Sequence, residues 1–283
     1  MTYPEFEKWL KDSDRVPLVM GVLNVTPDSF SDGGKFATPS AAVARAHEMI
    51  SQGATLIDIG GESTRPGAAR ISAQEQIQRI IPVIEQLKNC GALLSVDTTR
   101  AAVARAAINA GAHLINDISG GLDDPGMLKC AAELSVPIVL MHTRGQPANM
   151  QTMTDYVDVT AEVIDHLAGR KQAAIEAGIA AHRVLLDPGI GFAKTMGHNL
   201  ILLKRLQEFK RLNQPLLLGT SRKSFIGKIT GEDEPSRRLF GTAATISWCV
   251  TNGAAIVRVH DVAEMVKVVG MSQAIACSNE FNT

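Results

Sequence analysis

Eight short apolar segments recur along the chain, and each is followed by a stretch with the periodicity of an amphipathic helix. The segments are rich in Val, Ile and Leu, and they cover residues 18–25, 55–60, 93–97, 114–119, 137–142, 184–189, 216–220 and 255–260. Near-continuous apolar strands that alternate with helices are typical of a parallel sheet covered on both faces. Eight such units in about 250 residues favour a closed (β/α)8 TIM barrel, an α/β fold. A doubly wound open sheet of eight strands is the competing architecture.

The alternation predicts one barrel domain with a short segment at either end. Residues 18–275 are expected to form the barrel, residues 1–17 an N-terminal extension and residues 276–283 a C-terminal tail. The extension can form a short helix that packs Phe6 and Trp9 over the bottom of the barrel. No low-complexity linker or block of like charges interrupts the chain, so no second domain is expected.

Charge and cysteine usage argue against several classes of protein. The 28 Lys and Arg residues nearly balance 29 Asp and Glu residues, so a nucleic-acid partner is not expected. Four scattered cysteines without a Cys-x-x-Cys pair argue against a disulfide framework or structural zinc, and favour a reducing compartment. The polar N-terminus does not resemble a signal peptide, and no apolar run reaches the roughly 18 residues of a membrane span. We therefore expect a cytoplasmic protein with no membrane partner.

Polar side chains lie where the predicted strands end. They are Asn24, Asp58, Asp97, Asn116, His142, Asp187, Arg222 with Lys223, and Arg258 with His260. In a (β/α)8 barrel these positions converge on one mouth, where the loops after the strands build the active site. A single Asp or Asn there can simply cap the following helix, but strand after strand ending in this way predicts a functional site.

The residue types at this mouth divide into two groups. One group suits a phosphate or pyrophosphate clamp, since the guanidinium fork matches phosphate oxygens: Asn24, Thr64, Arg65, Arg258 and His260. The other group combines carboxylates, an amide and an ammonium group: Asp97, Asn116, Asp187 and Lys223. Buried carboxylates are costly without a partner, so this second group predicts a flat heterocyclic ligand with donors and acceptors.

Two glycine-rich loops are expected to lie over the mouth. Residues 26–36 include Gly33 and Gly34, and residues 60–67 place Arg65 among glycines. Glycine permits backbone conformations that are closed to other residues, so both loops can approach a ligand closely. Ordinary connecting loops are the alternative, although long loops at the catalytic face of a barrel more often serve function.

The polar strand ends and both loops lie within a series of short motifs. In chain order they are MGVLNVTPDSFSDGG (20–34), DIGGESTRPG (58–67), SVDT (95–98), IND (115–117), DPGIGF (187–192), GTSRKS (219–224) and RVHD (258–261). This ordered series resembles the dihydropteroate synthase family, the bacterial enzymes inhibited by sulfonamides, and the likeness extends over residues 18–268. It implies a transferase of folate biosynthesis. The family condenses 6-hydroxymethyl-7,8-dihydropterin pyrophosphate with p-aminobenzoate, giving 7,8-dihydropteroate and pyrophosphate.

The resemblance implies a role for each group of residues. The pterin ring is expected to bind Asp97, Asn116, Asp187 and Lys223. The pyrophosphate is expected to bind Asn24, Thr64, Arg65, Arg258 and His260. Asn24 is also expected to help hold Mg2+, the one cofactor that the resemblance implies. The pocket for p-aminobenzoate is expected to contain Thr64, Pro66, Phe192 and Ser224.

The expected reaction begins with loss of pyrophosphate and continues with attack by the amine. The site must then stabilise a dispersed cation and a highly charged leaving group. We expect Asp32, Arg65 and Lys223 to be catalytic, with Asp32 near the developing positive charge. Asp58 could contact substrate or support the residues that do, and no role is assigned to His142 or Arg144. A homodimer is expected from the family resemblance alone.

Two other functions fit part of the pattern. A methyltetrahydrofolate-dependent methyltransferase would share the pterin-binding residues but would not need a pyrophosphate clamp. The Ser-Thr-Arg-Pro loop at 63–66 and the pair Arg258 and His260 therefore argue against it. A non-catalytic pterin-binding homologue, kept for regulation, is the second alternative. The presence of every loop residue expected for chemistry argues against that alternative.

Overall fold

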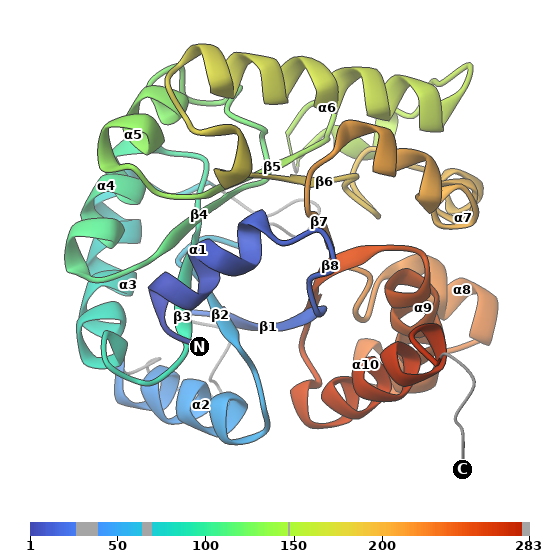
Figure 1. Ribbon diagram of the computed structural model, residues 1–283, viewed down its shortest axis with the longest axis horizontal. Helices are drawn as coiled ribbons and strands as arrows, with labels where there is room; N and C mark the ends of the chain where they lie inside the picture. Colours follow the sequence, from blue (N-terminus) through green and yellow to red (C-terminus); the bar gives the residue numbers. More distant parts are fainter. Residues whose placement is uncertain (27–38, 64–69, 147, 279–283) are drawn as a thin grey trace.

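Eight parallel strands close into a barrel in the computed structural model of the protein (Figure 1). The structure describes residues 1–26, 39–63, 70–146 and 148–278. The strands follow chain order around the barrel: β1 (Leu18–Asn24), β2 (Leu56–Gly60), β3 (Leu93–Asp97), β4 (Leu114–Asp117), β5 (Ile138–Met141), β6 (Val184–Asp187), β7 (Leu216–Leu218) and β8 (Ala254–Val259). The prediction of a closed (β/α)8 TIM barrel is confirmed, and the open doubly wound sheet is excluded.

The barrel closes because β1 pairs with both β2 and β8. Met20 of β1 lies beside Leu56 of β2 on one side and Arg258 of β8 on the other. Each strand is buried along nearly its whole length, as the apolar segments predict. The carboxyl ends of all eight strands therefore open at one mouth.

Helices cover the outside of the barrel. They are α2 (Pro39–Ser51), α3 (Ala73–Leu87), α4 (Ala101–Ala110), α5 (Met127–Leu134), α6 (Val159–Glu176), α7 (Met196–Lys204), α8 (Ser224–Thr230), α9 (Leu239–Thr251) and α10 (Val262–Ala276). The apolar faces of these helices and the outer faces of the strands form the larger of two hydrophobic clusters. This helical layer holds the strands, and so the polar residues at their ends, in fixed positions.

Asp158 contacts the start of α6 and the end of α7. α6 begins at Val159 because the side chain of Asp158 accepts hydrogen bonds from the N–H groups of Thr160 and Ala161. α7 ends at Lys204, and a 3-10 helix (Leu206–Leu212) follows after Arg205. The guanidinium of Arg205 pairs with Asp158, so the break lies where the two helices are joined by an ion pair.

The N-terminal segment forms a helix, α1 (Tyr3–Lys11), that lies across the end of the barrel opposite the mouth (Figure 1). Thr2 and Glu5 form a capping box at its start. Phe6, Trp9 and Leu10 are buried in a cluster with side chains from the barrel interior, including those at the starts of several strands. Packing of this helix against the barrel bottom thus agrees with the sequence expectation.

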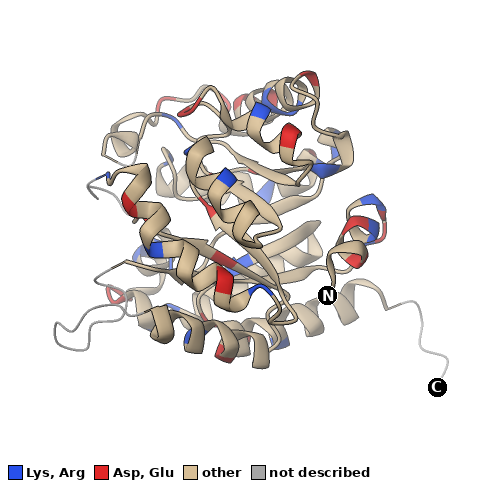
Figure 2. Cartoon of the chain, turned by 90° about the vertical axis from the view of Figure 1, so that its left-hand side faces the viewer, with Lys and Arg blue, Asp and Glu red and all other residues tan. Residues whose placement is uncertain are grey.

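Basic and acidic residues alternate along the ribbon in Figure 2, where neither sign gathers into a stripe. This distribution fits the near-zero net charge. No helix within the described ranges is both long enough and apolar enough to cross a membrane.

Candidate active site

Four of the side chains predicted at the strand ends meet in one buried cluster. Arg258 Nε donates to Asp58 Oδ2 at 2.6 Å, and its Nη2 donates to Asp97 Oδ2 at 2.9 Å. Asn116 Nδ2 donates to the same Asp58 oxygen at 2.9 Å. One arginine therefore joins strands β2 and β3 to β8, while the Asn116 amide on β4 binds the same Asp58 oxygen.

Asp58 is fully buried, and this favours a supporting role over direct contact with a substrate. Its Oδ2 binds Asn116 and Arg258, while Oδ1 has no hydrogen-bond partner among the described residues. A carboxylate with no exposed surface supports its neighbours and does not face a ligand directly. Asp58 orients the amide of Asn116 and the guanidinium of Arg258.

Asp97 is held in an environment that disfavours its charge. Burial and, to a lesser extent, the charge of nearby Asp58 raise the pKa of Asp97 to about 7, although Arg258 acts in the opposite direction. A carboxylate with an unusually high pKa in a cleft is typical of a functional site. The cost of keeping it ionised falls when a ligand donates hydrogen bonds to it.

Asp187 and Lys223 form the other side of this group. Burial raises the pKa of Asp187 to about 6, although its Oδ1 accepts the N–H of Gly189 at 2.7 Å. Loss of solvent around the ammonium group lowers the pKa of Lys223 to about 8, while the charge of Asp187 opposes that shift. The Lys223 ammonium lies 4.1 Å from the centre of the Phe192 ring, so the two are in cation–π contact.

His260 follows β8 and is neutral at pH 7. Burial and the charge of Arg258 lower the pKa of His260 to about 3. Its Nδ1 lies 3.0 Å from Ser221 Oγ, which also accepts the His260 backbone N–H. Because Ser221 Oγ accepts the backbone N–H through a lone pair, its own hydroxyl proton can be donated to Nδ1. The proton of the neutral imidazole is then on Nε2. His260 is therefore a neutral hydrogen-bond donor beside the Arg258 cation.

The remaining predicted site residues divide between described and undescribed parts of the chain. Asn24 ends β1, and the absence of a side chain at Gly60 leaves open the space between Asn24 Oδ1 and Asp97. Ser224 is exposed as the first residue of α8. Four residues with expected roles lie outside the described residues: Asp32, Thr64, Arg65 and Pro66.

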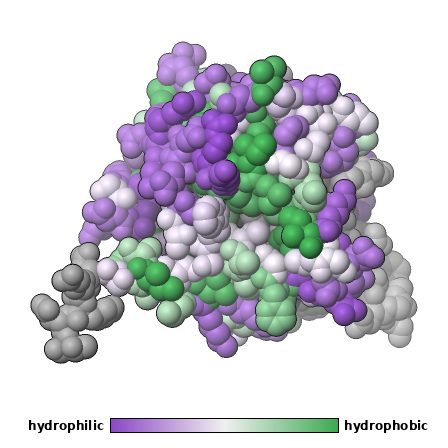
Figure 3. All heavy atoms as spheres, turned by 90° about the vertical axis from the view of Figure 1, so that its right-hand side faces the viewer, coloured by the Kyte–Doolittle hydropathy of each residue, from purple (hydrophilic) through white to green (hydrophobic). Residues whose placement is uncertain are grey.

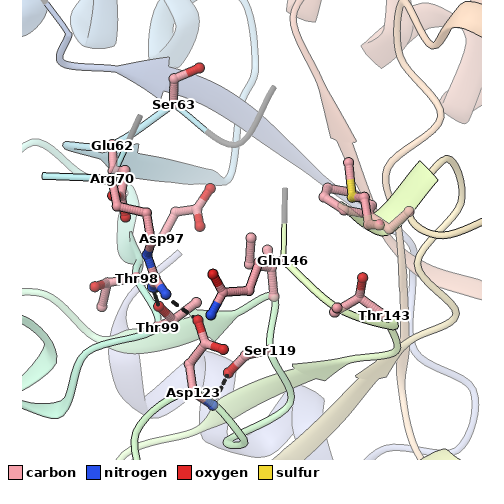
Figure 4. Close-up of a pocket in the computed structure, with 14 residues that line it drawn as sticks. Glu62, Ser63, Arg70, Asp97, Thr98, Thr99, Ser119, Asp123, Thr143 and Gln146 are labelled. Carbon is pink, nitrogen blue, oxygen red and sulfur yellow. Dashed lines mark hydrogen bonds and ion pairs between the residues drawn. The ribbon is translucent and has the colours of Figure 1, made fainter. Parts of the chain in front are cut away.

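A cleft of about 590 Å³, counting its open mouth, reaches from Asp97 to Phe192 (Figure 4). Arg70 lines it and binds both Asp123, at 2.9 Å, and Thr99, at 2.8 Å. Sequence reasoning did not single out these three residues. Arg70 follows the second glycine-rich loop, and Thr99 follows β3. Their positions after strands are the sequence feature that could have predicted a place at the barrel mouth.

The described residues offer no cluster of three or more His, Cys, Asp or Glu side chains that could hold a metal ion. A protein-only cage is therefore absent from this part of the chain. Mg2+ commonly binds through one or two protein oxygens together with substrate phosphates and water. The amide oxygen of Asn24, beside the open space at Gly60, fits that kind of site.

A (β/α)8 barrel with carboxylates, an amide and a cation pair at its mouth has the features of a pterin-binding barrel enzyme. The sequence model of the pterin-binding enzyme family matches residues 20–260. A dihydropteroate synthase from Synechocystis is 48% identical over 91% of this chain and 89% of that protein. The chain therefore belongs to the dihydropteroate synthase family, and it is a transferase of folate synthesis.

Solved structures agree with this assignment. A dihydropteroate synthase from Xanthomonas albilineans, determined with 4-aminobenzoic acid, has a TM-score of 0.88 and 45% identity over 93% of this chain and 94% of that chain. The same enzyme with 7,8-dihydropteroate has a TM-score of 0.85 and 43% identity, covering 93% and 95% of the two chains. The predictions of family, fold and transferase class are confirmed.

Proposed function

We propose that this chain joins 6-hydroxymethyl-7,8-dihydropterin pyrophosphate to p-aminobenzoate at the barrel mouth, releasing pyrophosphate and 7,8-dihydropteroate. The observation that carries the proposal is the cluster of Arg258 with Asp58, Asp97 and Asn116. In this cluster the Arg258 guanidinium, which can bind pyrophosphate, lies next to the Asp97 carboxylate and the Asn116 amide, which can bind a pterin. The ligands of the two Xanthomonas albilineans structures are a substrate and the product of this reaction.

The pterin ring binds to the second group of strand-end residues. The carboxylates of Asp97 and Asp187 accept hydrogen bonds from ring N–H groups, and the Lys223 ammonium donates to a ring acceptor. Asn116 is oriented for the same ring by Asp58. The amine substrate binds along Phe192 and Ser224. Thr64 and Pro66, which lie outside the described residues, keep the role in amine binding that the family resemblance implies.

The reaction proceeds by an SN1-like route. The bond between the methylene carbon and the pyrophosphate oxygen breaks first, and its electron pair leaves with the pyrophosphate. Asn24, Arg258 and neutral His260 bind the leaving group, together with Thr64 and Arg65. The amine nitrogen then forms the new C–N bond and releases a proton. An aryl amine is already neutral at pH 7, so this step needs no strong general base.

Two further residues act on the charges that develop. Asp32, which lies outside the described residues, is assigned the role of offsetting the cation formed on the pterin methylene, and Lys223 keeps the ring oriented while the cation forms. Bound beside Asn24, Mg2+ would offset negative charge on the departing pyrophosphate. In this way the proposal assigns Asp32, Lys223 and Asn24 of this chain to steps of the family's reaction.

Steady-state formation of 7,8-dihydropteroate from the two substrates tests the proposal. Turnover is expected with Mg2+ and is expected to be lost when EDTA removes it, while binding of pterin alone should persist. Tight pterin binding without turnover under any metal condition would overturn the synthase proposal and favour a non-catalytic pterin-binding protein.

We also propose that the chain is a cytoplasmic homodimer. Large apolar side chains on the outer helices of the C-terminal half are exposed: Leu200, Ile201, Phe240, Trp248, Met271 and Ile275. Apolar side chains form a band on the face that these helices share (Figure 3). An exposed apolar patch of this kind supports a protein interface. All four cysteines are free thiols, which supports a reducing compartment.

A further inference from the structure

The turn between β6 and α7 has an unfavourable backbone conformation. Gly189 and Gly191 have φ of +69° and +85°, and Ala193 has φ of +50° although it carries a Cβ atom. A non-glycine residue in the left-handed region is uncommon and is retained only where surrounding contacts hold it. Such conformations cluster at ligand-binding sites.

Two side chains from outside the strand-end cluster donate hydrogen bonds to the backbone carbonyls just before and just after the Cα atom of Ala193. Lys194 Nζ donates to the Phe192 carbonyl at 2.9 Å, and the Tyr156 hydroxyl donates to the Ala193 carbonyl at 3.0 Å. Lys194 is only 3% exposed, and its Nζ also lies 3.0 Å from His142 Nδ1. It therefore ties the turn to the end of β5.

The amine of Lys194 can act as a donor in either charge state. Burial lowers the pKa of Lys194 to about 7, with Asp187 opposing that shift and Lys223 and Arg144 adding to it. Burial and the Lys194 charge lower the pKa of His142 to about 2, so its ring is a neutral acceptor. Because both NH3+ and NH2 carry N–H bonds, the contact with the Phe192 carbonyl does not depend on the proton.

The turn holds two groups of the proposed site. The Phe192 ring lies under the Lys223 ammonium at 4.1 Å. A Cβ atom at Gly191 would lie 2.9 Å from Lys223 Cδ, so the stem of Lys223 rests directly on the backbone of the turn. A shift of the turn would therefore move the Phe192 wall of the amine pocket directly, whereas it would reach Lys223 only through its flexible side-chain stem.

We propose that Lys194 and Tyr156 are positioning residues that fix the Phe192 turn and thereby set the affinity for the aromatic amine. This inference rests on the proposed function, because it takes Phe192 as a wall of the p-aminobenzoate pocket. Neither side chain contacts substrate in this assignment. Each acts through the backbone carbonyl that it binds.

The test compares Tyr156→Phe and Lys194→Met with a matched control, Lys171→Met. Lys171 Nζ also donates to a carbonyl, that of Leu212 at 2.8 Å, but away from the mouth. Both turn variants should raise the KM for p-aminobenzoate, Lys194→Met by about tenfold and Tyr156→Phe by less, with kcat changed far less than KM. The control should change only the melting temperature.

Amide hydrogen exchange over residues 189–195 provides a readout that does not need turnover. Exchange there should quicken in both turn variants and stay unchanged in Lys171→Met. If the KM and the exchange rate of Tyr156→Phe both match the wild type, the inference is wrong, even if Lys194→Met fails to fold. A wild-type chain without turnover would overturn the proposed function, while the exchange data would still decide whether the turn is held as described.

Discussion

Arg258 Nε lies 2.6 Å from Asp58 Oδ2, although 200 residues of chain separate them. The two residues are on β8 and β2, the strands that flank β1 on either side. The pair therefore exists only when the barrel is closed. Since Arg258 also binds Asp97 and Asp58 also binds Asn116, closure of the barrel assembles the support for Asp97 and Asn116 of the proposed pterin site.

Replacing Asp58 with Ala should strongly destabilise the fold. The change leaves a buried guanidinium with one carboxylate in place of two, and removing one partner of a buried pair costs about 3 kcal/mol. The control is Asp123→Ala, because the ion pair of Asp123 with Arg70 is partly exposed and contributes less than about 1 kcal/mol. Urea unfolding measures both changes, and similar losses for the two variants would contradict a central role for Asp58.

Arg258→Ala should weaken the binding of pterin as well as that of pyrophosphate. A pure pyrophosphate clamp would leave pterin affinity unchanged, but Arg258 is the cation that lowers the pKa of Asp97. Without it the Asp97 pKa should rise further above about 7, and less carboxylate would remain to accept pterin N–H groups. Calorimetric titration with each ligand measures the effect, with Arg105→Ala on the outer surface as a control. Unchanged pterin affinity would show that the two subsites are independent.

Pterin binding should weaken as the pH falls through about 7, because burial raises the pKa of Asp97 to about 7 and protonation removes its acceptor. The free energy of unfolding changes with pH in the opposite direction. The folded carboxyl binds a proton that the unfolded one has already released, so this contribution is present at low pH and is lost as the pH rises through about 7. The melting temperature of the wild type should therefore fall relative to Asp97→Asn between about pH 5 and 8. A constant difference between the two proteins would contradict the raised pKa.

Gly189→Ala should destabilise the protein much more than Gly91→Ala. Both glycines have left-handed φ, +69° and +84°, so both substitutions carry the backbone cost of about 1 kcal/mol. A Cβ atom at position 189 would lie 1.9 Å from the His142 carbonyl oxygen, whereas nothing lies within 4 Å of one at position 91. Chemical unfolding measures the loss of stability in each variant, and the difference between the two losses is the cost of the steric clash at position 189. Equal destabilisation would mean that the turn can move away from β5 at little cost.

Phe240→Asp should convert the proposed dimer into a monomer. The Phe240 side chain is 87% exposed, so its loss should change the stability of the single chain by less than about 0.5 kcal/mol. Val157→Asp is the control, since Val157 is also exposed but lies outside the helices that carry the apolar patch. Light scattering after gel filtration measures the mass of each variant. A wild-type monomer, or a Phe240→Asp dimer, would contradict the proposed interface.

The sequence by itself determined the barrel and the polar side chains that end its strands, but not Arg70, Thr99 and Asp123, which line the cleft. A strand segment such as Val184–Asp187 is continuously apolar and ends in a polar residue, and that local pattern requires no knowledge of the partner strand. The polar residues ending these segments must then meet, because parallel strands in a closed barrel end at the same face.

Only the tertiary structure decided which of these side chains bind one another. The support role of Asp58 depends on Asn116 and Arg258 reaching the same oxygen from β4 and β8. The role of Lys194 depends on the left-handed backbone at Ala193 and on Tyr156, which lies 37 residues earlier. Periodicity and motif spacing report which face of an element is buried. Hydrogen bonds between distant strands depend instead on register, closure and side-chain direction, which the packed barrel determines.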